Sequence, residues 1–425
     1  MPRAAREDRP GPSADRAPAP ASGQPHTGAA VVAQRSGTAH ARPVTTTAPP
    51  TAAARLSGQP TSGHGFLAAL DDRRRALAAF GPNWFASVMG TSIVATAAVT
   101  LPVSAPWLRP FALGVWVLAG LLLVAVTAAT AVHWLRHPER ARAHLRNPVM
   151  AQFYGAPPMA LLAFGTATLL VGIDVLGTRI GLAADVVLWL VGTAFGLLAA
   201  VVVPYRLFTR LEVAPDGAYG GWHMPVVPPM VSAATGALLV PHTPAGQLRQ
   251  TLLLGCYAMF GMSLLATVVV VTLLWSRLAQ HKVGPAAMVP TLWIVLGPLG
   301  QSITAANNLG NQAALALPSQ DASAFRVVGL VYGVPVWGFG LMWAVLAGAI
   351  TVRTARSGLP FTLSWWSFVF PVGTMVTGTS DLAVASGSDL FRGAAVLFFV
   401  GLVGAWVVVA VRTAAGTWSG RLLRA

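Results

Sequence analysis

Ten apolar runs recur along the chain between residues 82 and 411. Each approaches the roughly 20 residues that a helix needs to cross a bilayer. Only 10% of the residues are charged, whereas soluble domains carry about 25%. The sequence therefore predicts an all-α integral membrane protein with ten transmembrane helices. We place these helices at 82–102, 110–134, 154–175, 183–203, 225–240, 250–275, 287–306, 327–351, 363–385 and 390–411.

The basic residues between these runs predict how the chain crosses the membrane. If the chain starts in the cytoplasm, 16 Lys and Arg residues from Arg73 onward face the cytoplasm and only 5 face the other side. Cytoplasmic loops of membrane proteins show this excess. The net charge of +15 is thus explained by topology and anionic lipid rather than by nucleic acid. We expect a multi-pass protein of the plasma membrane with both termini in the cytoplasm.

Odd and even runs differ in composition. The even runs are mostly smooth Leu, Val and Ala, and only the eighth has an internal proline, Pro335. The odd runs combine proline with Gly, Thr and Ser, and their expected kinks lie at Pro158, Pro229, Pro298 and Pro371. Kinks free backbone groups, which are tolerated only inside protein or beside water. We predict five helical hairpins with the odd helices as an inner pore ring and the even helices as an outer ring. The alternative is that the difference between odd and even runs arose by chance, because Gly and Pro are common in membrane helices.

The ends of the chain differ from the membrane part. Residues 1–70 are rich in Ala, Pro, Gly, Thr and Arg, which predicts a disordered cytoplasmic tail. They contain no apolar core typical of a signal peptide. Residues 76–412 form the predicted membrane domain, and 413–425 a cytoplasmic C-terminal tail. A single cysteine, Cys256, excludes a disulfide framework and a multi-cysteine metal site.

Polar residues of the odd helices are candidates for lining a pore. No Lys or Arg lies deep in any run, and the N-termini of broken helices could instead point partial positive charge inward. For each hydroxyl the alternative is a bond to its own helix backbone, and Asn307 or Asn308 could equally cap a helix. The candidates are Thr91, Ser92, Thr166, Ser232, Thr235, Gln301, Ser302, Thr374 and Thr377.

Charged and titratable groups within the runs are few. Asp174, Asp185 and Asp381 fall near outer helix ends, where a solvated or capping role is expected. Asp381 lies on a predicted pore helix, so it is also the candidate for proton coupling. His133 and His137 have the i, i+4 spacing of metal ligands, but no third ligand is in view, which favours a basic interfacial face. We expect no metal and no cofactor.

Three short motifs carry a family resemblance. The segments NWFASVMGTSIVA (83–95), LGPLGQS (296–302) and WWSFVFP (365–371) resemble the tellurite-resistance/dicarboxylate transporter family. That family includes plant slow anion channels, malic acid permeases and fungal sulfite efflux pumps. Ser92 stands where the malate and sulfite branch usually has a second glycine. The resemblance implies ten helices around a central pore, a homotrimer, and a phenylalanine plug at Phe370.

The aromatic residues around the predicted plug have alternative roles. Phe370 could instead pack against a neighbouring helix. Phe368, on another face of the helix, is expected to pack in that way. Trp365 and Trp366 are expected in the cytoplasmic interfacial belt.

Together, these features predict transport of small anions through a central pore gated by Phe370. The candidate cargoes are C4-dicarboxylates such as malate, sulfite, and inorganic anions. The alternative is a proton-coupled secondary carrier for a monoanionic organic acid or sulfite. A membrane-embedded enzyme or a sensor is a third class, but the runs contain no convergent nucleophile, base or metal ligands. The expected partners are a small anion and the lipid bilayer.

Overall fold

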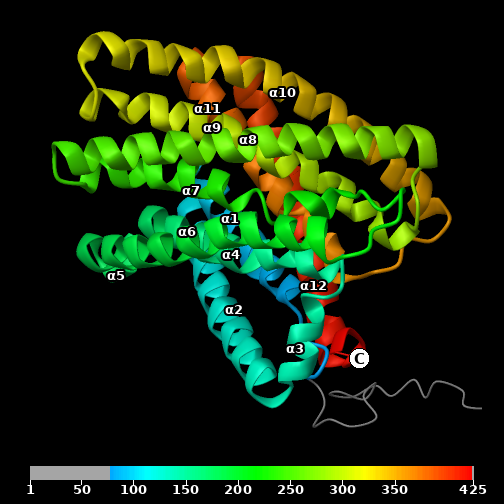
Figure 1. Ribbon diagram of the computed structural model, residues 1–425. Helices are drawn as coiled ribbons and strands as arrows, with labels where there is room; N and C mark the ends of the chain where they lie inside the picture. Colours follow the sequence, from blue (N-terminus) through cyan, green and yellow to red (C-terminus); the bar gives the residue numbers. More distant parts are fainter. Residues whose placement is uncertain (1–76, 424–425) are drawn as a thin grey trace, which may run out of the picture. The chain divides into compact units, whose positions relative to one another are not determined.

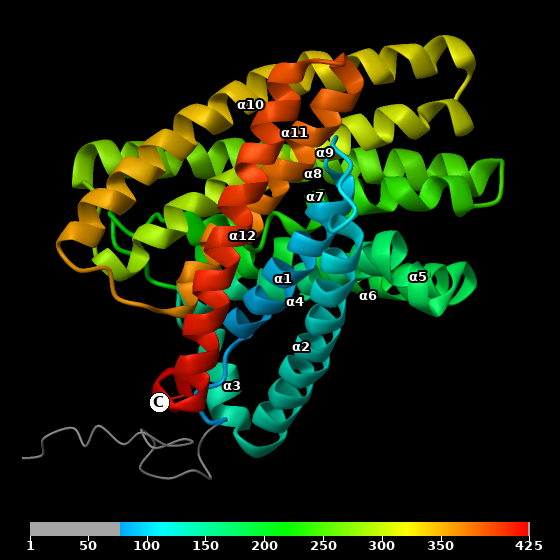
Figure 2. The ribbon, with the colours of Figure 1, turned by 180° about the vertical axis from the view of Figure 1, so that it is seen from behind.

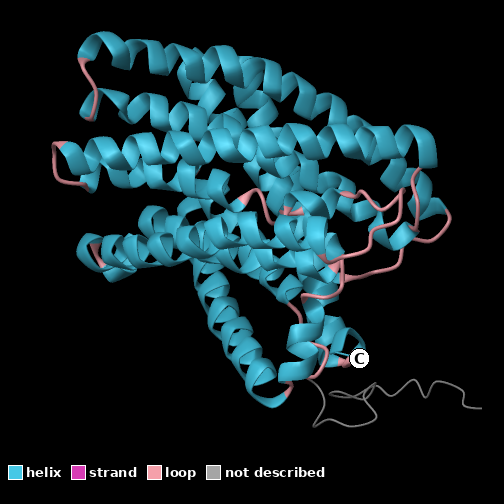
Figure 3. Ribbon diagram, in the orientation of Figure 1, coloured by secondary structure: helices cyan, strands magenta, loops and turns pink. Residues whose placement is uncertain are grey.

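The computed structural model describes residues 77–423, and within this range every regular element is a helix (Figure 3). The tail predicted at 1–70 lies outside the described residues. Of the predicted C-terminal tail, residues 413–418 continue helix α12 and Leu423 is buried. The last helix is therefore longer than its apolar run, because its final turns pack against other parts of the protein.

Five segments share one design, in which a 3-10 helix leads into an α-helix. The short, tight 3-10 start is an irregular backbone that a regular membrane helix would not need. The five are η3 Pro82–Trp84 with α1 Phe85–Thr100, η4 Met150–Gly155 with α4 Ala156–Ala167, η6 Gly220–His223 with α7 Pro228–Gly236, η8 Ala286–Val295 with α9 Leu296–Gln312, and η10 Leu363–Phe368 with α11 Phe370–Ser386.

Shorter pieces extend three of these segments. After α4 come the π-helix η5 Thr168–Gly172 and α5 Ile173–Leu176. Two further 3-10 helices follow α7 and α9, namely η7 Ala237–His242 and η9 Ala313–Leu315.

The remaining long helices are continuous and alternate with these segments along the chain. They are α2 Leu108–Arg136, α6 Thr178–Thr209, α8 Gln247–His281, α10 Ser319–Arg356 and α12 Asp389–Trp418. Two of them contain an internal proline, Pro335 in α10 and Pro204 in α6. Pro204 lay beyond the predicted end of its helix, which the structure extends to Thr209. Two short elements, α3 Pro138–His144 and η11 Arg421–Leu423, were not predicted.

Burial separates the two kinds of segment. In the most apolar stretches of Met150–Leu176, Ala286–Leu315 and Leu363–Ser386, between 61% and 78% of residues are buried. The corresponding share in the five long helices is only 22–28%. All nine residues of α7 are buried as well. The long helices therefore expose apolar side chains outward, as lipid-facing helices do.

Among the described residues, eight helices are long and apolar enough to cross a membrane. They include all five long helices and the three buried segments just compared. The segments containing α1 and α7 are not among the eight. The prediction of an all-helical, multi-pass membrane protein is thus confirmed, whereas ten crossings stay a prediction.

Contacts between helices follow a regular order. The buried helix α1 packs on α4, α4 on α7, α7 on α9, α9 on α11, and α11 returns to α1. Each long helix packs on the buried helix that precedes it in the chain, so that α2 lies on α1 and α12 on α11. Figure 2 shows α12 and α2 on either side of α1, and Figure 1 shows α8 and α10 running along α9.

The 3-10 segments form a second closed cycle at the N-terminal ends of these helices. In order, η3, η4, η6, η8 and η10 each contact the next, and η10 contacts η3. Glycine makes two of these junctions possible. A Cβ atom on Gly155 would lie 1.8 Å from the carbonyl oxygen of Met224, and one on Gly220 would lie 1.8 Å from that of Thr291. Backbone therefore packs directly on backbone there, without room for a side chain.

The prolines expected to kink the odd helices lie at the starts of α-helices. Pro158, Pro229, Pro298 and Pro371 each lie in the first turn of an α-helix. A proline there costs no hydrogen bond, because the first N–H groups of a helix have no partner within it. They mark where the 3-10 or turn backbone gives way to α-helix, rather than bends within continuous α-helices.

These junctions predict the effect of adding one methyl group. Gly155→Ala and Gly220→Ala should each destabilise the protein by about 1–3 kcal/mol or more, because rigid backbone must move. Gly401→Ala on α12 is the control, since nothing lies within 4 Å of its added Cβ. Thermal unfolding of the purified protein in detergent would measure this. Equal melting temperatures for Gly155→Ala and the control would contradict direct backbone packing.

Candidate functional site

Phe370 stands at the centre of the five buried segments. It is the first residue of α11, directly after the 3-10 segment η10, and only 3% of it is exposed. Two cavities lie beside it, and Phe370 is the one residue that lines both. Each cavity is lined by residues from all five buried segments. The phenyl ring therefore separates two compartments enclosed by the same helices.

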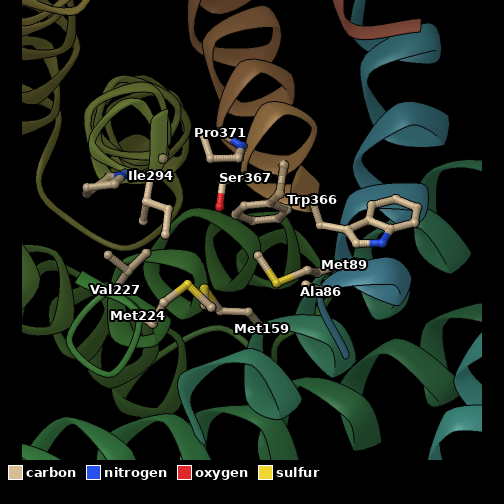
Figure 4. A pocket seen from close by; sticks show the side chains of 12 residues that line it. Ala86, Met89, Met159, Met224, Val227, Ile294, Trp366, Ser367 and Pro371 are labelled. Carbon is tan, nitrogen blue, oxygen red and sulfur yellow. The ribbon is translucent and has the colours of Figure 1, made fainter. Parts of the chain in front are cut away.

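The first compartment, here called the methionine cavity, lies on the 3-10 side of Phe370. Met89, Met159 and Met224 line it together with Val227 and Ile294 (Figure 4). Its volume is about 30 Å³, and no charged residue lines it. A single water molecule needs a cavity of about 10–15 Å³, so by size alone this space would hold one or two. The methionine cavity is therefore a narrow, apolar constriction.

The second compartment, here called the polar cavity, has a volume of about 120 Å³. It lies on the side of Phe370 toward which α11 continues. Its polar lining consists of Thr96, Thr100, Thr166, Thr235, Gln301, Thr304, Asn308, Thr377 and Asp381. No Lys or Arg lines either cavity.

Most of the hydroxyl groups in the polar cavity have partners within the protein. Thr166 and Thr235 donate hydrogen bonds to backbone carbonyls of their own helices. The sequence analysis had named such a bond as the alternative for each hydroxyl group. The Thr304 and Thr377 hydroxyl oxygens lie 2.9 Å apart and join α9 to α11. Gln301 differs, because its side-chain oxygen is buried without a partner. An amide with a free hydrogen-bonding group in a cavity is suited to contact a small polar solute.

The first turns of the five α-helices converge around Phe370. Residues that line the methionine cavity include Ala86 in the first turn of α1, Met159 in that of α4, and Gly297 in that of α9. Val227 is the N-cap residue of α7. The aligned peptide dipoles of an α-helix give its N-terminal end a partial positive charge. This arrangement supplies positive potential where no cationic side chain is present.

Asp381 belongs to the polar cavity rather than to a solvated helix end. It lies three turns beyond Phe370 on α11 and lines the cavity. One of its carboxylate oxygens, Oδ2, is buried without a hydrogen-bond partner, and Thr304 interacts with the carboxyl group. Such a group is suited to hold or release a proton.

The other two aspartates lie outside both cavities. Asp174 forms a bidentate ion pair with Arg109 at an exposed position, with a shortest distance of 2.6 Å. Asp185 was expected to be solvated or capping, but it is 1% exposed. Its carboxylate lies against α4, 2.5 Å from the position that a Cβ on Gly165 would occupy. The glycine in α4 leaves the space into which this side chain folds.

Four of the nine predicted lining residues, Thr166, Thr235, Gln301 and Thr377, face the polar cavity. The other five line neither cavity. The hydroxyl of Thr91 accepts a hydrogen bond from Trp406 of α12, and that of Ser232 accepts one from Thr193 of α6.

The remaining three residues are buried outside both cavities. Ser302 donates to the Leu299 carbonyl, and Thr374 to the Pro371 carbonyl. Ser92 is fully buried with no partner for its hydroxyl.

Sequence reasoning missed Thr96, Thr100 and Thr304 and left Asn308 as a cap. A helical stripe could have found them. On α9 the lining residues Gln301, Thr304 and Asn308 follow an i, i+3, i+7 pattern. Thr96 and Thr100 are four residues apart on α1. Extending each stripe from one assumed pore residue would have selected the cavity face and rejected the opposite one.

The predictions for the two tryptophans and the histidines have different outcomes. Trp366 is 3% exposed and donates to Thr413 of α12, so it is a buried packing residue rather than an interfacial one. Trp365 instead lies beneath the guanidinium of Arg412, 4.9 Å from the ring centroid. Within the described part of the chain, no cluster of three or more His, Cys, Asp or Glu side chains could hold a metal. His133 hydrogen-bonds the Leu77 carbonyl at 2.8 Å.

Comparison with known proteins gives a consistent result over the whole helical region. A family model described as the voltage-dependent anion channel matches residues 79–414. An uncharacterized transporter of Methanocaldococcus jannaschii is 27% identical over 351 residues, covering 81% of this chain and 97% of that protein. The sulfite efflux pump of Trichophyton rubrum is 27% identical over 355 residues, covering 82% of this chain and 94% of the pump. The sulfite efflux pump of Candida albicans is 24% identical over 328 residues, covering 71% and 66%.

The assignment of residues to the polar cavity can be tested with thiol chemistry. The one native cysteine, Cys256, is buried and would be replaced first by Cys256→Ala. In that background Thr377→Cys should react with methyl methanethiosulfonate, because it faces the polar cavity. Thr91→Cys should stay unmodified, because its side chain points at α12. Mass spectrometry would measure the adduct, and equal modification of both variants would contradict the assignment.

Proposed function

Because the chain belongs to the voltage-dependent anion channel family, we propose that it carries small anions across the cell membrane through a pore between its five buried segments. The matched family and the named relatives are channels or transporters rather than enzymes. The observation that carries the proposal is the position of Phe370 between two cavities that all five segments line. An apolar ring at such a position blocks ions, because they cannot shed their water there.

We extend this proposal to the architecture in the membrane. Ten transmembrane helices form five hairpins, with the helices of the buried segments as the pore ring and the long helices as the outer ring. Both termini lie in the cytoplasm, because this orientation places the excess of Lys and Arg residues on the cytoplasmic side. The methionine cavity then opens toward the cytoplasm, and the polar cavity toward the opposite side. The functional unit is a homotrimer in the plasma membrane, as the family resemblance implies.

The lining of the two cavities suggests how an anion would pass. The convergent helix N-termini attract negative charge without a fixed cation, which would bind an anion too tightly to release it. The polar cavity has room for several water molecules or one small anion. Sulfite is the first cargo to test, because relatives of similar length are sulfite efflux pumps. C4-dicarboxylates such as malate and inorganic anions are the other candidates.

Removing the phenyl ring tests the gate. Phe370→Ala should raise anion flux into proteoliposomes by about tenfold or more, because a lower barrier acts exponentially on rate. Flux of chloride, nitrate, sulfite and malate would be measured side by side, which also ranks the cargoes. Phe368→Ala is the matched control, since its ring packs on Trp293 and Trp365 outside the two cavities. Unchanged flux in a folded Phe370→Ala variant would contradict the assignment of Phe370 as the gate.

Asp381 favours a second candidate, a proton-coupled carrier for a monoanionic organic acid or sulfite. Its carboxyl group lines the polar cavity with an unpartnered oxygen, so it could accept a proton as the anion binds. On this mechanism a pH gradient drives uptake, and Asp381→Asn abolishes the gradient-driven part of the flux. Asp174→Asn, at the exposed ion pair, is the control. Voltage-driven anion current without proton movement would exclude the carrier.

A further inference from the structure

The methionine cavity has a composition that plugging by Phe370 does not require. Its three methionines come from three separate parts of the chain, in α1, in α4 and directly after η6. Figure 4 shows the side chains of Met89, Met159 and Met224 gathered on one side of the space, opposite Pro371. All three are at most 5% exposed. They line the cavity that lies on the 3-10 side of Phe370.

The space between these side chains is too small and too apolar to solvate an ion. About 30 Å³ is open, and Ser367 supplies the one hydroxyl group among the lining residues. A water molecule in a protein needs two to four polar partners to be held there. An apolar constriction of this size expels water, and an ion cannot cross a dry gap without losing its hydration. The methionine side chains therefore add apolar surface next to the ring of Phe370, which lines the same cavity.

The backbone at Met224 is tightly packed. The carbonyl group of Met224 packs against Gly155, with no space for even a Cβ atom between them. The neighbouring 3-10 segments close into a cycle. The constriction can therefore open by rotation of side chains rather than by separation of helices. Methionine is suited to this, because it is unbranched and flexible and repacks easily.

We propose that Met89, Met159 and Met224 form a second, dewetting barrier in series with Phe370. The proposal rests on the pore function proposed above, and it assigns to these residues a role beyond packing. With two barriers in series, Phe370→Ala alone raises flux, but only to the level that the methionine barrier still permits. The methionine barrier is broken by polarity, whereas an apolar replacement of similar size preserves it.

The test compares polar and apolar replacements in the Phe370→Ala background. Adding Met89→Ser, Met159→Ser and Met224→Ser should raise chloride and sulfite flux by a further tenfold or so, because a second barrier has been lowered. The same three positions changed to Leu should leave flux at the Phe370→Ala level. Met262→Ser on α8, 45% exposed toward the lipid side, is the control for polarity outside the pore. Size-exclusion profiles and melting temperatures identify variants that have not folded.

Osmotic water permeability of the same proteoliposomes separates the barrier from the cargo. Stopped-flow light scattering should show faster water movement in the Ser variants than in the Leu variants. If no tested anion passes any variant but water permeability rises, the anion function fails while the methionine barrier stands. If Phe370→Ala alone gives full anion and water flux, and folded Ser variants add nothing, the series barrier is overturned while the pore function stands.

Discussion

The structure depends on the requirement that every backbone polar group inside a bilayer find a partner within the protein. Five of its segments begin as 3-10 helices, whose backbone hydrogen bonds have poorer geometry than those of an α-helix. Such backbone is excluded from lipid. The buried segments therefore pack on one another in a closed order, and continuous helices such as α8 and α12 cover them. The arrangement of buried and exposed helices follows from where irregular backbone is placed.

The same irregular starts bring the first turns of the α-helices together inside the protein. Residues from the first turns of α1, α4, α9 and α11 line the methionine cavity, so these α-helices begin beside Phe370. Positive potential is thus present without Lys or Arg, and without the cost of burying a cationic side chain. The apolar residues at the same level oppose passage by excluding water. Helix N-termini that attract anions and apolar side chains that exclude water thus lie at the same level of the protein. The gated anion pathway proposed above requires both.

Sequence reasoning succeeded where a residue type has one physical meaning in a membrane. Runs of Leu, Val and Ala in α2, α6 and α12 could only be apolar helices, and the structure has them near their predicted positions. The three short motifs also indicated the correct family, which the match over residues 79–414 confirms. The orientation of hydroxyl side chains was harder to predict. Thr91 and Thr377 are the same residue type in similar surroundings, but one faces α12 and the other faces the polar cavity.

The sequence by itself determined that this chain is a helical membrane protein, which segments carry Pro, Gly and Thr, and that Phe370 stands next to the break marked by Pro371. These follow from composition and from local backbone chemistry. Only the tertiary structure decided that Phe370 divides two cavities, that Asp381 lies in one of them, and that Met89, Met159 and Met224 meet in the other. The physical reason is that a cavity is formed by residues distant in the chain. Their shared face depends on helix rotation and on junctions such as Gly155 against Met224, which no local pattern specifies.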